Sequence, residues 1–470
     1  MTIRLHDTLT GGTRPLIPLR EDRIGIYSCG PTVYGPAHIG NFRSFLFADL
    51  LVRHMRWRGL RVTWVMNITD IDDKIIRGAA AAGVSIDVLA ERYLALFLTD
   101  AAALRMTMPD VLPRATAHIE AIVALVATLL ERGHAYTTDD GSIFFRISSW
   151  PAYGRLARLD PEGLRVGERV EADEYGKDDV RDFALWKGPK PGEPSWETAI
   201  GPGRPGWHIE CSAMSMTHLG PSFDIHTGGV DLIFPHHEDE IAQSEAATGQ
   251  TFVATWLHCA HLQTGGAKMA KRTGNIARVG DVLATGVSPR ALRLALISVH
   301  YRAGLSHTDE SLAAAGAALD RLDAAVAALD GYEQAGPDDA TLPERLDAAR
   351  MAFGDALDDD LNISAGLAVV FDLVRDLNRR LERRTLSNTD AGRALATLRD
   401  LDQVLAILPD EATELDATAT GLLEARAAAR AARDFAASDR LRDELAALGI
   451  TVEDTRDGQR WRQITEGGHG

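Results

Sequence analysis

The first hundred residues of this chain alternate between short apolar runs and longer amphipathic stretches. Residues 24–27 and 62–66 have the composition of buried strands, whereas residues 45–51 and 86–104 have the apolar spacing of helices. Such alternation favours a parallel sheet, because each parallel connection needs a return segment that is usually a helix. The pattern therefore predicts an α/β fold with a Rossmann-type parallel sheet over residues 1–300.

Two changes of pattern divide the rest of the chain. Between about residues 109 and 203, a helical stretch (118–133), a strand-like run (143–147) and Pro- and Gly-rich loops (189–194, 201–206) predict an insertion between the two halves of the sheet. After Pro289 the chain is rich in Ala and Leu, with Arg and Asp on the polar faces and no strand pattern before its last few turns. We expect a helical bundle over residues 301–415 and a small mixed tail over residues 416–470.

Composition limits the class of protein. The formal net charge of −17 argues against a general nucleic-acid coat protein, so any RNA contact must be local. The N-terminus lacks the apolar core of a signal peptide, and no apolar run is long enough to span a bilayer. Only three cysteines occur, Cys29, Cys211 and Cys259, too few for a disulfide framework. We expect a cytoplasmic protein without membrane contact.

Two short motifs have the features of a triphosphate site. Residues 36–41 lie between the first strand and the first helix, where an anion meets free backbone N–H groups and a favourable helix dipole. In this motif His38 and Asn41 can donate to phosphate oxygens, and Gly40 allows adenine to approach the backbone. The second motif, residues 268–272, carries Lys268 and Lys271 in a Gly-rich stretch that can close over phosphates.

Together the two motifs resemble the signature sequences of class I aminoacyl-tRNA synthetases. Residues 27–34, 67–74, 206–212 and 234–238 also resemble cysteinyl-tRNA synthetases, and the likeness extends to Trp461. The resemblance implies a catalytic domain (1–300), a helical domain and an anticodon-binding tail, with ATP, Mg²⁺, L-cysteine and tRNA(Cys) as ligands and a monomeric state. It also implies that His38, Asn41, Lys268 and Lys271 act in catalysis. The second motif departs from the family at Ala270 and Arg272, where serines are usual, and the first at Asn41, where many class I enzymes have a second histidine.

A metal site is the second chemical hypothesis. His236 and Glu240 are four residues apart, so on a helix they share one face, and Cys29 follows the first strand at the edge where α/β folds bind ligands. Together with Cys211 they make a plausible tetrahedral zinc set. By spacing alone the assignment stays open, because neighbouring side chains compete and two buried cysteines would need no metal. The competing ligands are His237, Glu238 and Asp239. The resemblance implies that the set of four holds one zinc ion, which selects cysteine over serine.

The remaining candidates concern the amino acid and the RNA. The resemblance places Cys29, Thr69 and Trp207 in the substrate pocket, although Trp207 could instead pack in the core. Arg426, Arg430 and Arg433 are spaced to share one helical face that either contacts phosphates or is merely solvated. Trp461 could stack on an anticodon base or close the last small core. Two other functions remain possible: a ligase that joins cysteine to an amino sugar, and a nonenzymatic protein that binds zinc and cysteine.

Overall fold

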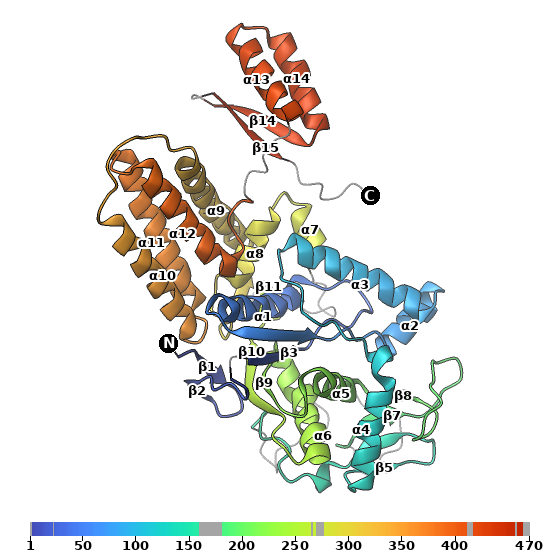
Figure 1. The fold of residues 1–470 in the computed structure, drawn as a ribbon. Helices are drawn as coiled ribbons and strands as arrows, with labels where there is room; N and C mark the ends of the chain where they lie inside the picture. The colour runs from blue at the N-terminus through green and yellow to red at the C-terminus, as the bar shows by residue number, and fades with distance from the viewer. Residues whose placement is uncertain are drawn as a thin grey trace. The chain divides into compact units, whose positions relative to one another are not determined.

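The computed structural model describes residues 2–21, 23–158, 181–264, 267–268, 277–410, 417–455 and 458–463. The chain forms two compact units, Met1–Leu408 and Pro409–Gly470. Figure 1 shows the helices and strands of both units. Among the described residues, no helix combines the length and the apolarity that crossing a membrane requires.

A four-stranded parallel sheet forms the centre of the first unit. It comprises β3 (Arg23–Ser28), β4 (Arg61–Met66), β9 (Phe223–Gly229) and β10 (Val253–Cys259), in the order β10-β9-β3-β4. Helix α1 (Ile39–Trp57) connects β3 to β4 and packs with Ile26 on one face, whereas Tyr27 packs with α5 (Trp207–Leu219) and α6 (Glu238–Thr248) on the other. The α/β class with a Rossmann-type parallel sheet is therefore confirmed.

Other elements of this part surround the parallel sheet. Helices α2 (Asp73–Ala82) and α3 (Ile86–Ala103) follow β4, and the hairpin of β1 (Arg4–Asp7) and β2 (Gly12–Pro15) precedes β3. The sequence pattern missed this hairpin. Its strands are four residues each, too short to show a reliable alternation, and β1 is also held by packing against β10.

An antiparallel sheet lies between β4 and β9 along the chain. It comprises β5 (Ala135–Thr137), β6 (Ile143–Phe145), β7 (Phe183–Lys187) and β8 (Arg204–Pro205), preceded by α4 (Ile119–Glu131). Its apolar side chains form one cluster with residues of α5 and α6. The inserted sheet therefore packs on the same two helices that cover one face of the parallel sheet.

The helical part of the first unit begins with α7 (Val279–Leu283) and α8 (Pro289–Ile297). It continues through α9 (Asp309–Asp330), α10 (Leu342–Asp358), α11 (Ile363–Glu382) and α12 (Asn388–Leu405). The expectation of no strand here is wrong at one point, because β13 (Leu305–His307) pairs in parallel with β11 (Leu262–Thr264), which also pairs with β12 (Ala267–Lys268). A strand of three residues is stabilised by its partner and leaves no periodic signal in the sequence.

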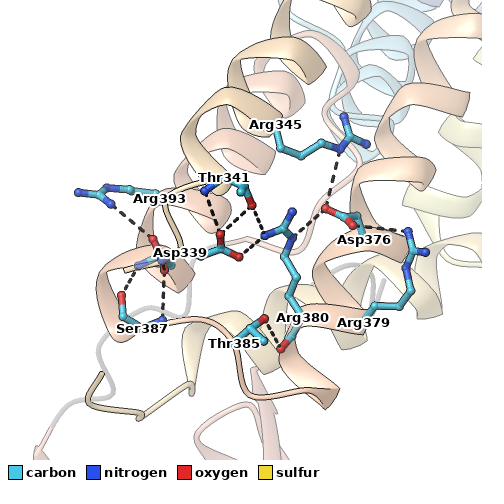
Figure 2. A network of polar contacts seen from close by, with 10 residues as sticks. Asp339, Thr341, Arg345, Asp376, Arg379, Arg380, Thr385, Ser387 and Arg393 are labelled. Carbon is cyan, nitrogen blue, oxygen red and sulfur yellow. Dashed lines mark hydrogen bonds and ion pairs between the residues drawn. The ribbon is translucent and has the colours of Figure 1, made fainter. Parts of the chain in front are cut away.

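Polar side chains hold the α9–α10 loop against the bundle, as Figure 2 shows. Arg380 on α11 donates to Asp376 at 2.9 Å and also contacts Asp339 in the loop, while Ser387 donates to Asp338 at 2.7 Å. Arg393 on α12 donates to the same loop carboxylate at 2.9 Å. These contacts are partly exposed, so each stabilises only slightly, and the apolar seams between the helices hold the bundle together.

The second unit packs two helices on a hairpin. It contains α13 (Ala417–Ala431), α14 (Phe435–Ala447), β14 (Ile450–Thr455) and β15 (Gly458–Gln463). Arg426 is 1% exposed and donates to Asp454 at 3.1 Å and to Gln459 at 2.8 Å. Arg430 contacts the other oxygen of the same carboxylate at 2.8 Å, so the two arginines share a face, but on that face Arg426 is buried between α13 and the hairpin. Trp461 is partly buried against the unit's small apolar cluster.

Candidate active site

The four predicted metal ligands converge at the carboxyl edge of the parallel sheet. Cys29 follows β3, Cys211 lies on α5, His236 lies in a short helical turn (Ile233–His237), and Glu240 lies in the first turn of α6. One ligand atom from each lies within 4.8 Å of the others. The two sulfur atoms are 4.0 Å apart, and Nε2 of His236 is 3.1 Å from Oε1 of Glu240. Residues from four separate segments thus form one cluster.

A second grouping shares two members of this cluster. Cys29 and Glu240 are also within reach of His226 and His237, with His226 Nε2 3.0 Å from Glu240 Oε2 and His237 Nε2 3.3 Å from the Cys29 sulfur. Sequence reasoning overlooked His226, although a histidine inside an apolar strand pattern was an available signal. Glycine at 228 admits His237, since a Cβ there would lie 2.6 Å from its Cε1.

The electrostatics of the cluster suit a cation. A hydrogen bond from Cys29 lowers the pKa of Cys211 to about 6 against the opposing effect of burial, whereas burial raises the pKa of Cys29 itself. Although burial alone would lower it, the Glu240 carboxylate raises the pKa of His236 to about 10. Burial likewise opposes ionisation of Glu240, yet His226 and His236 hold its pKa at about 2. A set of two thiols, one imidazole and one carboxylate with these partners fits zinc.

Two of the competing ligands face away from the cluster. The buried carboxylate of Glu238 accepts the backbone N–H groups of Gly154 at 2.8 Å and of Leu156 and Ala157 at 2.9 Å each. Asp239 accepts the hydroxyl proton of Tyr153. Both carboxylates therefore bind the inserted segment, and neither belongs to a metal-sized group among the described residues.

The first phosphate motif forms the N-terminus of α1. His38 is the N-cap: its Nδ1 accepts the N–H of Asn41, and Asn41 Oδ1 accepts the N–H of His38, both at 3.1 Å. A Cβ on Gly40 would lie 3.0 Å from the His38 ring, so a larger residue would crowd the cap. The pair thus organises a helix end whose dipole favours anions.

The chain on either side of the second motif lies beside this helix end. Before the motif, β11 packs on α1 and pairs with β12, which carries the backbone of Lys268. After the motif, the backbone carbonyl of Ala277 accepts the N–H of Ile39 at 3.0 Å, and the backbone of Arg278 forms an isolated antiparallel β-bridge with that of His38. The Lys268 side chain and all of Lys271 lie outside the described residues. Both flanks of the motif are therefore anchored at the N-terminus of α1.

Besides Cys29, which belongs to the cluster, the predicted substrate residues are Thr69 and Trp207. Trp207 is 38% exposed and its ring centroid lies 4.4 Å from that of His236, so it packs on one of the four clustered side chains and is not a core residue. Thr69 is buried and accepts from Asn67 Nδ2 at 3.1 Å, while Asn67 Oδ1 accepts the N–H of Gly30 at 2.9 Å. These bonds tie the ends of β3 and β4 together next to Cys29.

Cys259, the third cysteine, is not part of either metal-sized group. It ends β10 and is 1% exposed, and burial raises its pKa to about 11. At neutral pH it is therefore a neutral thiol that packs against the core around α1.

Comparison with known families identifies most of the chain. Residues 15–317 match the family described as "tRNA synthetases class I (C) catalytic domain". Residues 352–409 match "DALR domain", and residues 412–462 match "Cysteinyl-tRNA ligase anticodon binding domain". The catalytic match covers the parallel sheet, the inserted sheet and both phosphate motifs.

Curated relatives and solved structures agree with these matches. A protein named "Cysteine--tRNA ligase" from Symbiobacterium thermophilum is 46% identical to this chain over 474 residues, which cover 98% of this chain and 100% of that relative. A protein of the same name from Halorhodospira halophila is 45% identical over 474 residues, which cover 98% of this chain and 99% of that relative. Methionyl-tRNA synthetase of Mycobacterium tuberculosis, solved with methionyl-adenylate, aligns with TM-score 0.57 at 18% identity, covering 82% of this chain and 90% of that one. LeuRS of Agrobacterium radiobacter K84, solved in a ternary complex, aligns with TM-score 0.60 at 11% identity, covering 83% and 85%.

The structural likenesses show a shared fold, and the sequence comparisons are more specific. A catalytic-domain match over residues 15–317 and an anticodon-binding match over residues 412–462 occur in one chain. Relatives of 45–46% identity are covered almost from end to end. This chain therefore belongs to the cysteinyl-tRNA synthetase family of class I aminoacyl-tRNA synthetases.

Proposed function

We propose that this protein activates L-cysteine with ATP, forming cysteinyl-adenylate and pyrophosphate, and transfers the cysteine to the 3′ end of tRNA(Cys). The convergence of Cys29, Cys211, His236 and Glu240 beside the phosphate-binding end of α1 carries the proposal. A soft metal-ligand set next to a triphosphate site is what an enzyme needs to select a thiol amino acid and adenylate it. The names of the curated relatives support the same reaction.

We propose zinc as the metal, held by the two cysteines, His236 and Glu240. Of the two possible groupings, this one contains both thiols, and zinc has a strong affinity for thiolates. When bound, zinc would supply a coordination site for the substrate thiol that the serine hydroxyl cannot match near neutral pH. A pocket that relied on shape alone would separate the two amino acids weakly. Trp207 would cover the amino acid, and Thr69 would help to orient it.

The chemistry of activation requires no nucleophile from the protein. The substrate carboxylate attacks the α-phosphorus of ATP, so the site must position both reactants and stabilise the charge that builds on the phosphates. His38, Gly40 and Asn41 would hold the nucleotide at the N-terminus of α1, and Lys268 and Lys271 would neutralise the phosphates together with Mg²⁺. Ala270 and Arg272 change the side chains around the lysines and leave both lysines in place.

We further propose a division of labour along the chain. Residues 1–300 would form the catalytic domain, with its insertion at about 109–203, residues 301–415 the helical domain, and residues 416–470 the part that binds the anticodon. The family matches at 352–409 and 412–462 support the last two parts. We expect a monomer that acts in the cytoplasm, where its three cysteines stay reduced.

Cysteine-dependent ATP–pyrophosphate exchange, followed by charging of total tRNA, tests the proposal, with serine as the control amino acid. We expect exchange and charging with cysteine only. Exchange without charging would identify the amino-sugar ligase instead, and zinc binding with neither activity would identify a nonenzymatic protein.

Two variants assign the steps to residues. Lys271→Ala is expected to slow exchange by about a hundredfold or more, as when one charge-stabilising group is removed, while zinc content stays unchanged. Cys211→Ser is expected to lose zinc and to raise KM for cysteine. Normal zinc content in Cys211→Ser would overturn the assigned ligand set.

A further inference from the structure

A chain of polar contacts extends from His236 to the inserted segment. Nδ1 of His236 lies 2.7 Å from Nδ1 of His208, and Nε2 of His208 lies 3.3 Å from Oδ2 of Asp239. The hydroxyl of Tyr153 donates to Oδ1 of the same carboxylate. His236 and Asp239 are 2% and 1% exposed, so water cannot readily replace these contacts. Four side chains from three segments of the chain are thus connected in series.

A metal ion bound to His236 would determine which atom is the donor and which the acceptor in each contact of this series. Nε2 of His236 faces Glu240 in the metal cluster, so metal binding there leaves the proton on Nδ1. That N–H donates to Nδ1 of His208, which must then carry its own proton on Nε2 and direct it to Asp239. The carboxylate of Asp239 accepts the Tyr153 hydroxyl at Oδ1, and its Oδ2, which accepts no hydrogen bond from the described residues, lies 3.3 Å from Nε2 of His208. The proton positions along the whole series are therefore mutually consistent with metal on Nε2.

The ring of Tyr153 and the backbone that follows it have contacts besides the bond to Asp239. The next residues of its segment are bound through their backbone, because Glu238 accepts the N–H groups of Gly154, Leu156 and Ala157. The Tyr153 ring also packs against Phe183 of the inserted sheet, with centroids 6.3 Å apart. The position of Tyr153 therefore does not depend on its bond to Asp239 alone.

We propose that Tyr153, Asp239 and His208 are positioning residues for His236, through which the inserted segment fixes the tautomer and ring orientation that the metal requires. Outer-shell partners of this kind typically change metal affinity by 10- to 100-fold. The inference rests on the proposed function, because it takes His236 as a metal ligand. On this proposal the inserted segment influences metal binding, although that segment supplies none of the four metal ligands.

The test compares zinc binding by Tyr153→Phe and the unmodified protein, measured by competition with a chromophoric chelator. The variant keeps the ring and removes only the hydroxyl, so we expect zinc affinity to fall about tenfold, with a higher KM for cysteine and an unchanged KM for ATP. Tyr136→Phe is the matched control. It removes another tyrosine hydroxyl of the inserted sheet, which donates to Asp182 at 2.9 Å, and should leave zinc affinity unchanged.

A double-mutant cycle separates positioning from a general loss of structure. If Tyr153 acts through His208, then Tyr153→Phe should have less than about a twofold effect in a His208→Ala background. An undiminished effect there, or equal zinc affinities for Tyr153→Phe and Tyr136→Phe, would overturn the inference. Cys211→Ser, measured in the same assay, distinguishes failure of the ligand assignment from failure of the positioning role. Normal zinc binding by Cys211→Ser would refute the assignment of the four ligands. Loss of zinc by Cys211→Ser, with normal zinc binding by Tyr153→Phe, would refute only the positioning role of Tyr153.

Discussion

Replacing Glu238 with glutamine should loosen residues 154–157, the stretch between β6 and β7 that this carboxylate of α6 binds. The side chain is 1% exposed, and its Oε1 accepts the N–H of Gly154 while its Oε2 accepts those of Leu156 and Ala157. Glutamine has a single acceptor oxygen. If this oxygen keeps the bonds to Leu156 and Ala157, the amide NH₂ faces the N–H of Gly154, and two buried donors are left opposed without an acceptor.

The magnitude follows from these three bonds. A hydrogen bond to a charged group contributes about 1.5–3 kcal/mol, so losing one and weakening two costs about 3 kcal/mol. Burial raises the pKa of Glu238, so the carboxylate itself carries a desolvation cost that glutamine avoids. A net local loss of about 2 kcal/mol remains, which corresponds to a factor of about 30 in an opening equilibrium.

Amide hydrogen exchange measures this opening directly. We expect the amides of residues 154–157 to exchange about 30-fold faster in Glu238→Gln. Asp224→Asn is a matched control, because Asp224 also caps backbone N–H groups, those of Leu19 and Gly25 at 2.7 Å each, in another part of the unit. It should speed exchange at those two positions only. Unchanged exchange at residues 154–157 in Glu238→Gln would refute the reasoning.

Two paired carboxylates and one tight glycine give three further expected outcomes. Although burial opposes this shift, Lys187, at 2.7 Å, holds the pKa of Asp73 at about 2, and the value for the unfolded chain is about 3.9. The ionised Asp73 therefore stabilises the folded protein above about pH 4, and this contribution is lost as the pH falls towards 2. Because Asp73 is 39% exposed, Asp73→Asn should reduce this acid-linked loss by only about 1 kcal/mol in urea titrations; identical pH profiles would contradict it. Asp49→Asn should lower the free energy of unfolding by about 3–5 kcal/mol, since it removes the negative charge that the fully buried Arg293 guanidinium pairs with at 2.7 Å, and a loss below about 1 kcal/mol would count against this. In Gly30→Ala the new Cβ would lie 1.8 Å from a backbone carbonyl oxygen after β4, so the loop after β3 must shift and zinc content measured by mass spectrometry should fall; full zinc content would argue against the clash.

Sequence patterns predicted the longer elements and missed the short ones. The runs at residues 24–27 and 62–66 became β3 and β4, and the helical pattern at residues 86–104 became α3. The strands β1, β8 and β13 have two to four residues each. These strands are stabilised by pairing with a strand that is distant in the sequence, or by the sheet around them. The pattern of neighbouring residues in the sequence does not reveal that partner.

The same distinction applies to the site. Cys29, Cys211, His236 and Glu240 could be nominated from residue type and resemblance, and the structure brings their ligand atoms together. Their roles stay predictions, as do those of the phosphate-binding residues. The helical spacing of His236 and Glu240 holds, since the two side chains are 3.1 Å apart, but spacing could not exclude Glu238, because only packing against the inserted segment turns that carboxylate towards Gly154 and Leu156.

By itself, the sequence determined the α/β class and the family, since these depend on local periodicity and on residues close together in the chain. Only the tertiary structure decided which of five consecutive polar side chains face the sulfur atoms, that His226 joins them, that Arg426 is buried, and that Tyr153 reaches Asp239 from 86 residues away. The physical reason is that the direction of a side chain is set by the packing of its whole element against others. Contacts between distant segments form only where that packing brings their backbones within a few ångströms of each other.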